Sequence, residues 1–304
     1  MYPSGAQFEI RHGEHRATIV EVGAGIREYA HAGVPVLEPY PLGAMCDGGH
    51  GVPLIPWPNR LAQGRYSFDG AEHQLALTEP ARGGAIHGLT RWRSFTRTEQ
   101  TAGRVLMAMQ LHPSPGYPFS LSVQIAYELD AQGLSVATTA TNNGCSACPY
   151  GAGQHPYLSP GQGTLDACTL TLAADTRLIT DPASQVPIAS EPVSAELDFR
   201  SARPIGARAI DTCFTDLGRD SSGLVLARLL RADGSELELW ADEHHPYMQV
   251  FTGDTLAPGR RRTGLALEPM TCPSNAFRSG EGLIRLDPGE SITTRWGVRP
   301  TLAG

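Results

Sequence analysis

The chain has 304 residues, with 24 Lys or Arg against 31 Asp or Glu, so its formal net charge is -7. This balance excludes the broad basic surface with which proteins bind nucleic acid or an anionic membrane. No segment is long and apolar enough to span a bilayer, and residues 1–8 lack the basic and apolar regions of a signal peptide. We therefore expect a cytoplasmic protein whose partner is a small molecule.

Glycine and proline interrupt the sequence so often that long helices are not expected. The chain has 34 Gly and 24 Pro, and the longest segment without either, Thr164 to Asp181, alternates as strands do. All-β architectures of this length often form one unit, and no linker divides this chain. We expect a single all-β domain over residues 1–304, built as a large antiparallel β-sandwich.

The predicted strands follow one another at short intervals. Asp-Gly pairs at 69–70 and 233–234 predict tight hairpins, because both residues tolerate the positive φ that such turns need. Residues 121–129 alternate large apolar side chains with small or polar ones, as a half-buried strand requires. Residues 134–136 follow after a short turn and are the predicted antiparallel partner.

Six cysteines are spread through the sequence, and only Cys145 and Cys148 form a C-x-x-C pair. A structural zinc site would need a second pair, and a redox site would need the pair at the start of a helix. Here the pair follows an Asn-Asn-Gly turn signal and precedes a proline. We expect reduced cysteines, no metal and no cofactor, since a phosphate-binding glycine motif is also missing from the sequence.

Five polar residues stand in short, distinctive frames along this sequence. The frames are Pro-Trp-Pro-Asn-Arg, Ile-His-Gly, Gln-His-Pro-Tyr, Ile-Asp-Thr-Cys-Phe and Leu-Glu-Pro, and the residues are Arg60, His87, His155, Asp211 and Glu268. In this order and at these intervals they resemble the aldose 1-epimerase (galactose mutarotase) family. The resemblance covers nearly the whole chain, and it implies a cofactor-free enzyme that interconverts the α- and β-anomers of a free aldose.

Glu268 and His155 match the catalytic base and acid of that family. The period of two sends Glu268 to the strand face opposite Leu265, and Pro269 keeps it extended. By itself the pattern also fits a surface glutamate at a strand end. A lone histidine is more often structural, and His245 repeats the His-Pro-Tyr tripeptide. We choose His155 because it alone has the Gln-His-Pro-Tyr-Leu frame.

Arg60, His87 and Asp211 match residues that hydrogen-bond the sugar in that family. Guanidinium and carboxylate groups suit vicinal diols, because each presents two hydrogen-bonding atoms at a fixed separation. Without the resemblance they would be taken as a solvated or ion-paired arginine, a loop histidine and a turn or cap aspartate. For the catalytic pair we expect imidazolium at His155 and carboxylate at Glu268, each favouring the charge of the other.

The chain departs from the family pattern at Trp57, where many members have phenylalanine, and at 270–275, after the glutamate. These departures leave the base and acid intact but the substrate open. Trp57, Trp92 and Phe251 are candidates for a face on which a sugar ring stacks, and each also fits a core position.

Two other functions fit the same residues. A carbohydrate-binding protein would keep the cleft without turnover, although a binder does not need both a base and an acid. A mutarotase of anionic sugars, such as hexose 6-phosphates, sulfonated sugars or uronic acids, is the second alternative. Arg260, Arg261 and Arg262 form the only triple basic run, which either overhangs the cleft and binds such an anion or lies in a solvated loop.

Overall fold

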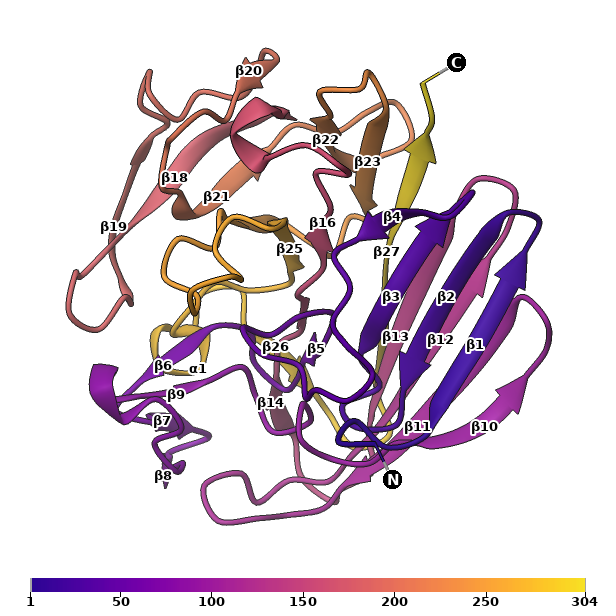
Figure 1. The fold of residues 1–304 in the computed structure, drawn as a ribbon. Helices are drawn as coiled ribbons and strands as arrows, with labels where there is room; N and C mark the ends of the chain where they lie inside the picture. The colour runs from indigo at the N-terminus through magenta and orange to yellow at the C-terminus, as the bar shows by residue number, and fades with distance from the viewer. Residues whose placement is uncertain (1, 304) are drawn as a thin grey trace.

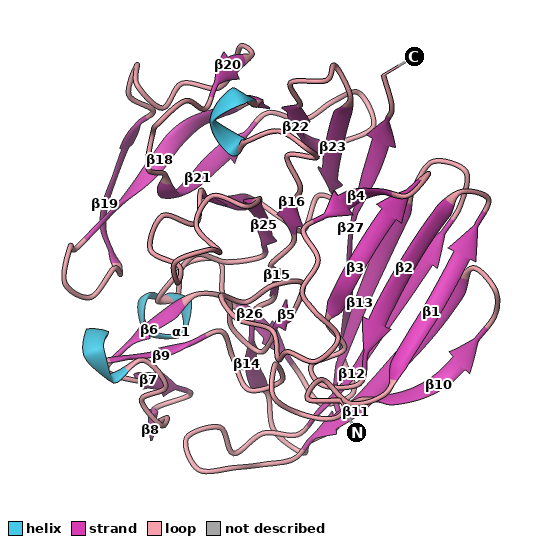
Figure 2. Ribbon diagram, in the orientation of Figure 1, coloured by secondary structure: helices cyan, strands magenta, loops and turns pink. Residues whose placement is uncertain are grey.

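The computed structural model describes residues 2–303, and its regular elements are almost all β-strands (Figures 1 and 2). Two large antiparallel sheets face each other, as predicted for a β-sandwich, and three two-stranded ribbons accompany them. The helices are single turns: η1 (Pro80–Arg82), η2 (Leu165–Ala167) and α1 (Ala276–Ser279). Among residues 2–303, no helix has the length and apolar character needed to cross a membrane.

The first sheet has twelve strands drawn from distant parts of the chain. Their spatial order is β1 (Gln7–His12), β2 (His15–Val20), β3 (Ile26–His31), β4 (Val34–Leu37), β16 (Tyr157–Leu158), β25 (Leu265–Met270), β24 (Tyr247–Phe251), β21 (Asp211–Leu217), β18 (Ala174–Thr180) and β19 (Pro187–Pro192). Beside this path, β15 (Gly153–Gln154) pairs with both β25 and β5 (Pro53–Leu54). The order places β16, β25, β24 and β21 side by side.

The second sheet has nine strands. Their order is β10 (Thr96–Gln100), β11 (Arg104–Leu111), β12 (Leu121–Leu129), β13 (Leu134–Asn142), β27 (Ser291–Thr301), β23 (Glu236–Ala241), β22 (Val225–Leu230), β17 (Thr169–Leu172) and β20 (Arg203–Pro204). The predicted hairpin is confirmed, with Leu129 opposite Leu134, and the odd positions of β12 are at most 3% exposed. Strand β13 runs beyond the predicted residues because its other edge pairs with β27.

The ribbons are β6 (Arg60–Ala62) with β9 (Gly84–Ile86), β7 (Arg65–Phe68) with β8 (Ala71–Gln74), and β14 (Cys148–Tyr150) with β26 (Ile284–Leu286). The Asp-Gly pair at 69–70 joins β7 to β8, and that at 233–234 lies between β22 and β23, so both predicted hairpins are confirmed. The segment 164–181 contains the whole of β17 and β18, as predicted, after the unpredicted turn η2. All six cysteines are free thiols, and only Cys145 is exposed.

One apolar cluster joins the two sheets. It includes Ile10 and Ile19 from the first sheet and Val123 and Ile125 from the second, all fully buried. Burial of such side chains stabilises the sandwich by about 1.5–3 kcal/mol each before the entropy cost of folding is subtracted. The strands that pack on this cluster therefore form a rigid support for polar residues that point away from it and for the loops that join the strands.

Candidate active site

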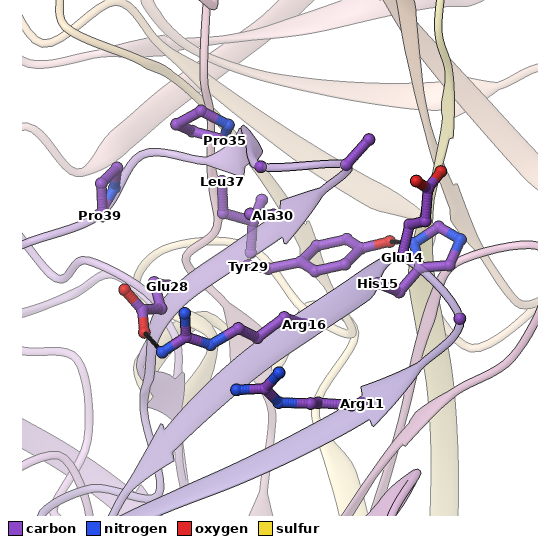
Figure 3. Close-up of a pocket in the computed structure, with 13 residues that line it drawn as sticks. Arg11, Glu14, His15, Arg16, Glu28, Tyr29, Ala30, Pro35, Leu37 and Pro39 are labelled. Atoms are coloured by element: carbon purple, nitrogen blue, oxygen red, sulfur yellow. Dashed lines mark hydrogen bonds and ion pairs between the residues drawn. The ribbon is translucent and has the colours of Figure 1, made fainter.

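Among residues 2–303, two of the concave regions have volumes that fit a small molecule. The larger, of about 510 Å³, is a groove over β1 to β4 (Figure 3). Its arginines are already paired, since Arg11 and Arg16 contact Glu9 at 2.6 and 2.5 Å. Its Tyr29 hydroxyl lies 3.0 Å from His15 Nδ1. None of the five predicted residues lines this groove.

The second cavity has a volume of about 380 Å³ and lies over β21, β24 and β25. It is lined by Gly48, Gly49, Asn59, Arg60, Glu79, Arg82, Ile86, His87, Arg91, His155, Gln185, Asp211, Gln249, Phe251, Thr255, Leu256 and Glu268. The fold thus brings all five predicted polar residues to one cavity, although they lie in five separate segments of the chain. This cavity is the candidate active site.

The strand register aligns three polar side chains across the cavity floor. Glu268 is in β25, where Leu265 and Leu267 belong to the apolar core. Gln249 of β24 lies opposite Glu268. Its Nε2 donates a hydrogen bond of 2.6 Å to Oδ1 of Asp211, the first residue of β21. Gln249 is a site residue that the motifs did not indicate, although the period of two places it on this face once the pairing is known.

His155 lies between β15 and β16, two short strands that both pair with β25. This arrangement places its imidazole beside Glu268, with Nε2 and Oε1 3.3 Å apart and the side chains 5% and 3% exposed. Among residues 2–303, His155 Nδ1 and Glu268 Oε2 have no hydrogen-bond partner. The two side chains therefore contact each other, and within residues 2–303 each keeps one polar atom without a hydrogen-bond partner.

Burial controls the protonation of this pair. It lowers the pKa of His155 to about 3 and raises the pKa of Glu268 well above its usual value, while the charges of His50 and Asp211 add smaller shifts. Loss of hydration opposes both ions. Burial therefore acts against the imidazolium and carboxylate expected from the motifs, and favours a neutral imidazole beside a protonated carboxyl. Transfer of one proton converts this pair to the ionic form.

Arg60 begins β6, and its guanidinium is held by a carboxylate that sequence reasoning missed. Its Nε and Nη2 donate to the two oxygens of Glu79 at 2.6 and 2.9 Å. Burial raises the pKa of Asp211, and the charge of Arg60 opposes that rise. Glu79 thus fixes the arginine fork in the cavity wall, where Arg60 still acts on Asp211 electrostatically.

His87 directly follows β9, so the same ribbon carries Arg60 and His87 to the cavity. Its φ is 62°, and a Cβ on the next residue, Gly88, would lie 2.0 Å from the carbonyl oxygen of Ile55, so glycine is required there. The ring of His87 meets that of His155 edge-on, with centroids 5.4 Å apart. Burial lowers the pKa of His87 well below its usual value. It is therefore a neutral hydrogen-bonding group.

Arg91 also lines the cavity, and nothing in the sequence pattern indicated it. Its guanidinium carbon lies 5.1 Å from the ring centroid of Trp92, and burial lowers its pKa. Within residues 2–303 it forms no ion pair and no side-chain hydrogen bond, whereas Arg60 and Arg82 contact Glu79, Arg82 at 3.5 Å. Arg91 is thus a cavity-lining cation without a carboxylate partner in the described part of the chain.

The three aromatic candidates for stacking have different places. Phe251 lines the cavity. Trp57 is 3% exposed and packs against Phe277, with ring centroids 5.5 Å apart, so it belongs to the core. Trp92 is 53% exposed and outside the cavity lining. Of the three, only Phe251 is placed to contact a ligand in this cavity.

His245 has a structural environment. Its Nδ1 lies 2.8 Å from Oδ1 of Asp242, whose other oxygen accepts the backbone N–H of Arg295 at 2.6 Å. The ring is buried and is absent from the cavity lining. Of the two His-Pro-Tyr copies, only the one with His155 supplies a cavity residue.

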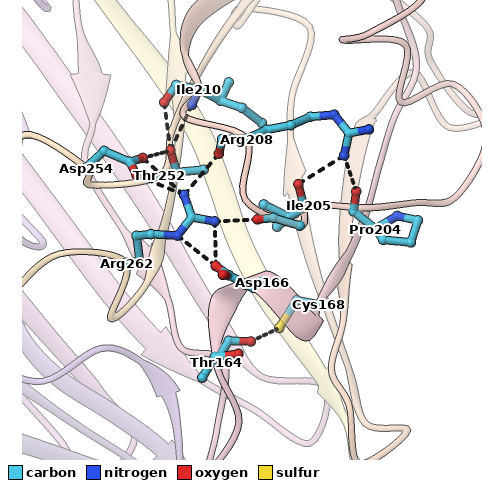
Figure 4. Close-up of polar contacts among 11 residues, drawn as sticks. Thr164, Asp166, Cys168, Pro204, Ile205, Arg208, Ile210, Thr252, Asp254 and Arg262 are labelled. Atoms are coloured by element: carbon cyan, nitrogen blue, oxygen red, sulfur yellow. Dashed lines mark hydrogen bonds and ion pairs between the residues drawn. The ribbon is translucent and has the colours of Figure 1, made fainter.

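The basic triplet 260–262 does not line the cavity, so of the two alternatives the overhang of the cleft is not supported. Arg262 is instead enclosed by Asp166 and Asp254, at 2.6 and 3.0 Å, and by backbone carbonyls (Figure 4). Arg260 Nη2 lies 2.9 Å from Nε2 of the buried His50. Only Arg261 is exposed. Two of the three charges serve the loop structure and are not free to bind an anion.

Comparison with known proteins gives the family of this all-β chain. The sequence model described as aldose 1-epimerase matches residues 6–299. The chain belongs to the aldose 1-epimerase family.

Relatives and solved structures agree with this assignment. The chain is 38% identical to Escherichia coli YihR over 303 residues, 95% of this chain and 92% of YihR, and YihR is itself uncharacterized. It is 32% identical to rat galactose mutarotase over 265 residues, 78% of this chain and 75% of that protein. The fold matches the Caenorhabditis elegans GalM/aldose epimerase homologue with a TM-score of 0.85 at 16% identity, covering 98% and 99% of the two chains.

Proposed function

We propose that this protein is an aldose 1-epimerase that interconverts the α- and β-anomers of a free aldose by acid–base ring opening and closure. The observation that carries the proposal is the 3.3 Å contact between His155 and Glu268 in a cavity lined by hydrogen-bonding side chains. The family membership and the similarity to the rat protein named galactose mutarotase support it.

The chemistry requires two proton transfers at neighbouring atoms. The hydroxyl O1 on the anomeric carbon must lose its proton while the ring oxygen O5 gains one, so that the C1–O5 bond breaks and a free aldehyde forms. O1 and O5 are both bonded to C1, so the base and the acid must lie close together. Glu268 is our proposed base and His155 our proposed acid, and rotation about C1–C2 followed by the reverse transfers closes the other anomer.

The neutral form of the pair is one proton transfer away from the working form. Glu268 must pass its proton to His155, and the carboxylate then accepts the proton of O1 while imidazolium donates to O5. Both forms of the pair carry the same net charge, but only the ionic form is disfavoured by the loss of hydration. A polar ligand that replaces this hydration therefore shifts the balance toward the ionic form. Arg60 favours the same direction, because its charge lowers the pKa of Glu268.

We assign sugar binding to Arg60, His87 and Asp211, and add Gln249. The Arg60 and Asp211 side chains keep lone pairs or N–H groups beyond their bonds to Glu79 and Gln249. Vicinal hydroxyls can both donate and accept hydrogen bonds, so they can bind to a cavity wall that offers the N–H groups of Arg60 and the carboxylate oxygens of Asp211. The cavity volume of about 380 Å³ lies near the lower end of small-molecule sites, as a monosaccharide requires.

A second candidate, an aldose that carries an anionic group, is favoured by Arg91. A partly buried guanidinium without a counterion has lost hydration and gained no partner, so a phosphate, sulfonate or carboxylate beside it would restore the balance. The charge of Arg60, by contrast, is already matched by Glu79. This candidate shares the acid–base mechanism and differs only in the substrate.

The role of Glu268 is tested by Glu268→Gln, which keeps the size and one oxygen but cannot take a proton. We expect kcat to fall by about 10²-fold or more, with sugar affinity changed by less than roughly tenfold, because proton transfer acts on the transition state. Polarimetry or exchange NMR on freshly dissolved α-sugars measures the rate. A wild-type protein that binds sugar but equilibrates anomers no faster than buffer would favour the carbohydrate-binding alternative. Full activity of the variant would refute the mechanism.

The two histidines give a matched comparison. His155→Asn should lower kcat by about 10²- to 10⁴-fold, the usual share of a general acid. His245→Asn should leave kcat nearly unchanged, although loss of its contact with Asp242 should lower the thermal midpoint of unfolding. Exchange NMR and thermal unfolding of both variants separate the two effects. The opposite pattern of rates would move the acid to His245.

The rate should follow a bell-shaped dependence on pH with a broad plateau. Because the pKa of His155 is lowered to about 3, the acid limb belongs to a second proton taken up there. The alkaline limb belongs to loss of the proton of Glu268, at a pKa well above its usual value of 4.5. Between the two limbs the pair holds one proton, so the fraction of the pair in the ionic form does not change with pH. Because the two groups share that proton, the two apparent pKa values describe the pair as a whole. An acid limb near pH 4.5 in the buffer-corrected rates would contradict a lowered pKa at His155 and a raised pKa at Glu268.

The anionic-substrate candidate is tested by Arg91→Gln. Loss of one charge-assisted hydrogen bond, worth about 1.5–3 kcal/mol, should raise KM for an anionic aldose by roughly 10- to 100-fold and leave a neutral aldose unchanged. The difference should shrink as salt is added. Arg261→Gln, which removes an exposed charge from outside the cavity, is the control. Equal kinetics of Arg91→Gln on both sugars would remove this candidate and leave the acid–base proposal standing.

A further inference from the structure

A glycine-rich loop, Asp47-Gly48-Gly49-His50-Gly51, lies against the proposed acid. Gly49 touches the ring of His155 so closely that a Cβ there would lie 2.6 Å from Cδ2 and 3.0 Å from Nε2. The backbone N–H of Gly51 donates to the carbonyl oxygen of His155 at 2.9 Å. The position of this loop, called here the glycine loop, therefore limits where the imidazole of His155 can lie.

Two further rings connect the glycine loop to His155. The ring of His50 stacks on that of Tyr157, with centroids 3.7 Å apart and planes 4° from parallel. Tyr157 in turn lies 5.0 Å from the ring of His155 at 15°. The Tyr157 hydroxyl donates to the carbonyl oxygen of Gly48 at 2.7 Å, which closes the unit. A shift of His50 would thus be transmitted to both neighbours of the acid.

Arg260 holds His50 from outside the cavity. Its Nη2 lies 2.9 Å from Nε2 of His50, whose Nδ1 lies 2.8 Å from the carbonyl oxygen of Asp47. A guanidinium can only donate, so Nε2 must be the acceptor and Nδ1–H must donate to Asp47. One tautomer of neutral His50 satisfies both contacts. The guanidinium therefore fixes the imidazole plane and the loop together.

His155 needs such support because hydrogen bonding alone does not orient it. Its Nδ1 has no partner among residues 2–303, whereas histidines in acid–base sites are commonly oriented by a bond at the second nitrogen. Packing by Gly49 and by the ring of Tyr157 takes that role here. We propose that Arg260 and His50 are positioning residues, which hold the glycine loop and Tyr157 against His155 and so aim the acid at the ring oxygen.

This inference rests on the proposed acid–base function, and it assigns a purpose to one arginine of the basic triplet. Arg260 has no place in the cavity lining, so it acts on the reaction through His50 and the loop and not on the substrate. Misplacement of an acid by about 1 Å can lower a rate by roughly 10²-fold. The effect should therefore fall on kcat and spare KM.

The test combines four variants with one control, all measured by exchange NMR. Arg260→Gln and His50→Phe should each lower kcat by about 10-fold or more, with KM within roughly threefold of wild type. The double variant should be no slower than the slower single variant, because the two residues act as one unit. Arg260→Lys keeps a donor for Nε2 and should recover most of the loss. The control, Arg261→Gln, removes the neighbouring exposed charge and should match wild type.

A second readout does not depend on turnover. In protein labelled with ¹⁵N-histidine, the His155 ring signals, assigned by their loss in His155→Asn, should shift or broaden in Arg260→Gln and stay in place in Arg261→Gln. Unchanged His155 signals and unchanged kcat in Arg260→Gln would overturn the inference, as would additive losses or a rise confined to KM. A wild-type protein without anomerase activity would refute the proposed function, while the ring signals would still decide whether Arg260 positions His155.

Discussion

The removal of two ionisable groups from water is the constraint on which the rest of the site depends. His155 and Glu268 are 4% and 2% exposed, and burying either as an ion would cost several kcal/mol. Their 3.3 Å contact allows one proton to reside on either partner, so the pair can be buried as a neutral unit. The same desolvation that disfavours the charged pair makes it responsive to whatever polar ligand enters the cavity.

The twelve-stranded sheet supports this pair together with Asp211 and Gln249, while a two-stranded ribbon and a loop supply further groups. Strand β25 lies within the twelve-stranded sheet and pairs with β24, β15 and β16, so Glu268 and the backbone next to His155 share one hydrogen-bonded framework. Arg60 and His87 arrive on a two-stranded ribbon, and Gly49 on the glycine loop. Sites supported by strands hold their geometry more closely than sites on loops, so the sheet fixes Glu268, Gln249 and Asp211 relative to one another.

The period of two predicted features that depend only on residues near one another in the sequence. The motif frames predicted the individual polar residues of the site. The alternation in β12 and the outward face of Glu268 follow from a period of two, which is a local property. Glu79, Arg91 and the contact of Arg260 with His50 could not be predicted, because each depends on loops meeting across the fold. The charge states of His155 and Glu268 were not predicted for a related reason: a motif indicates the attraction between them, but the burial that opposes both ions is a property of the whole cavity.

The arginines show why the number of charges in a segment does not predict what the charges do. In the run 260–262, Arg262 pairs with two aspartates and Arg260 contacts a histidine, so two of the three charges in this apparent anion site are engaged in internal contacts. Arg91 has one basic neighbour in the sequence, Arg93, and is not part of a basic run, yet it lines the cavity and forms no ion pair within residues 2–303. The electrostatic character of a binding site is set by the charges that folding leaves unmatched. Arg91 is one such charge in the described part of the chain, and it lines the candidate active site although the net charge is -7.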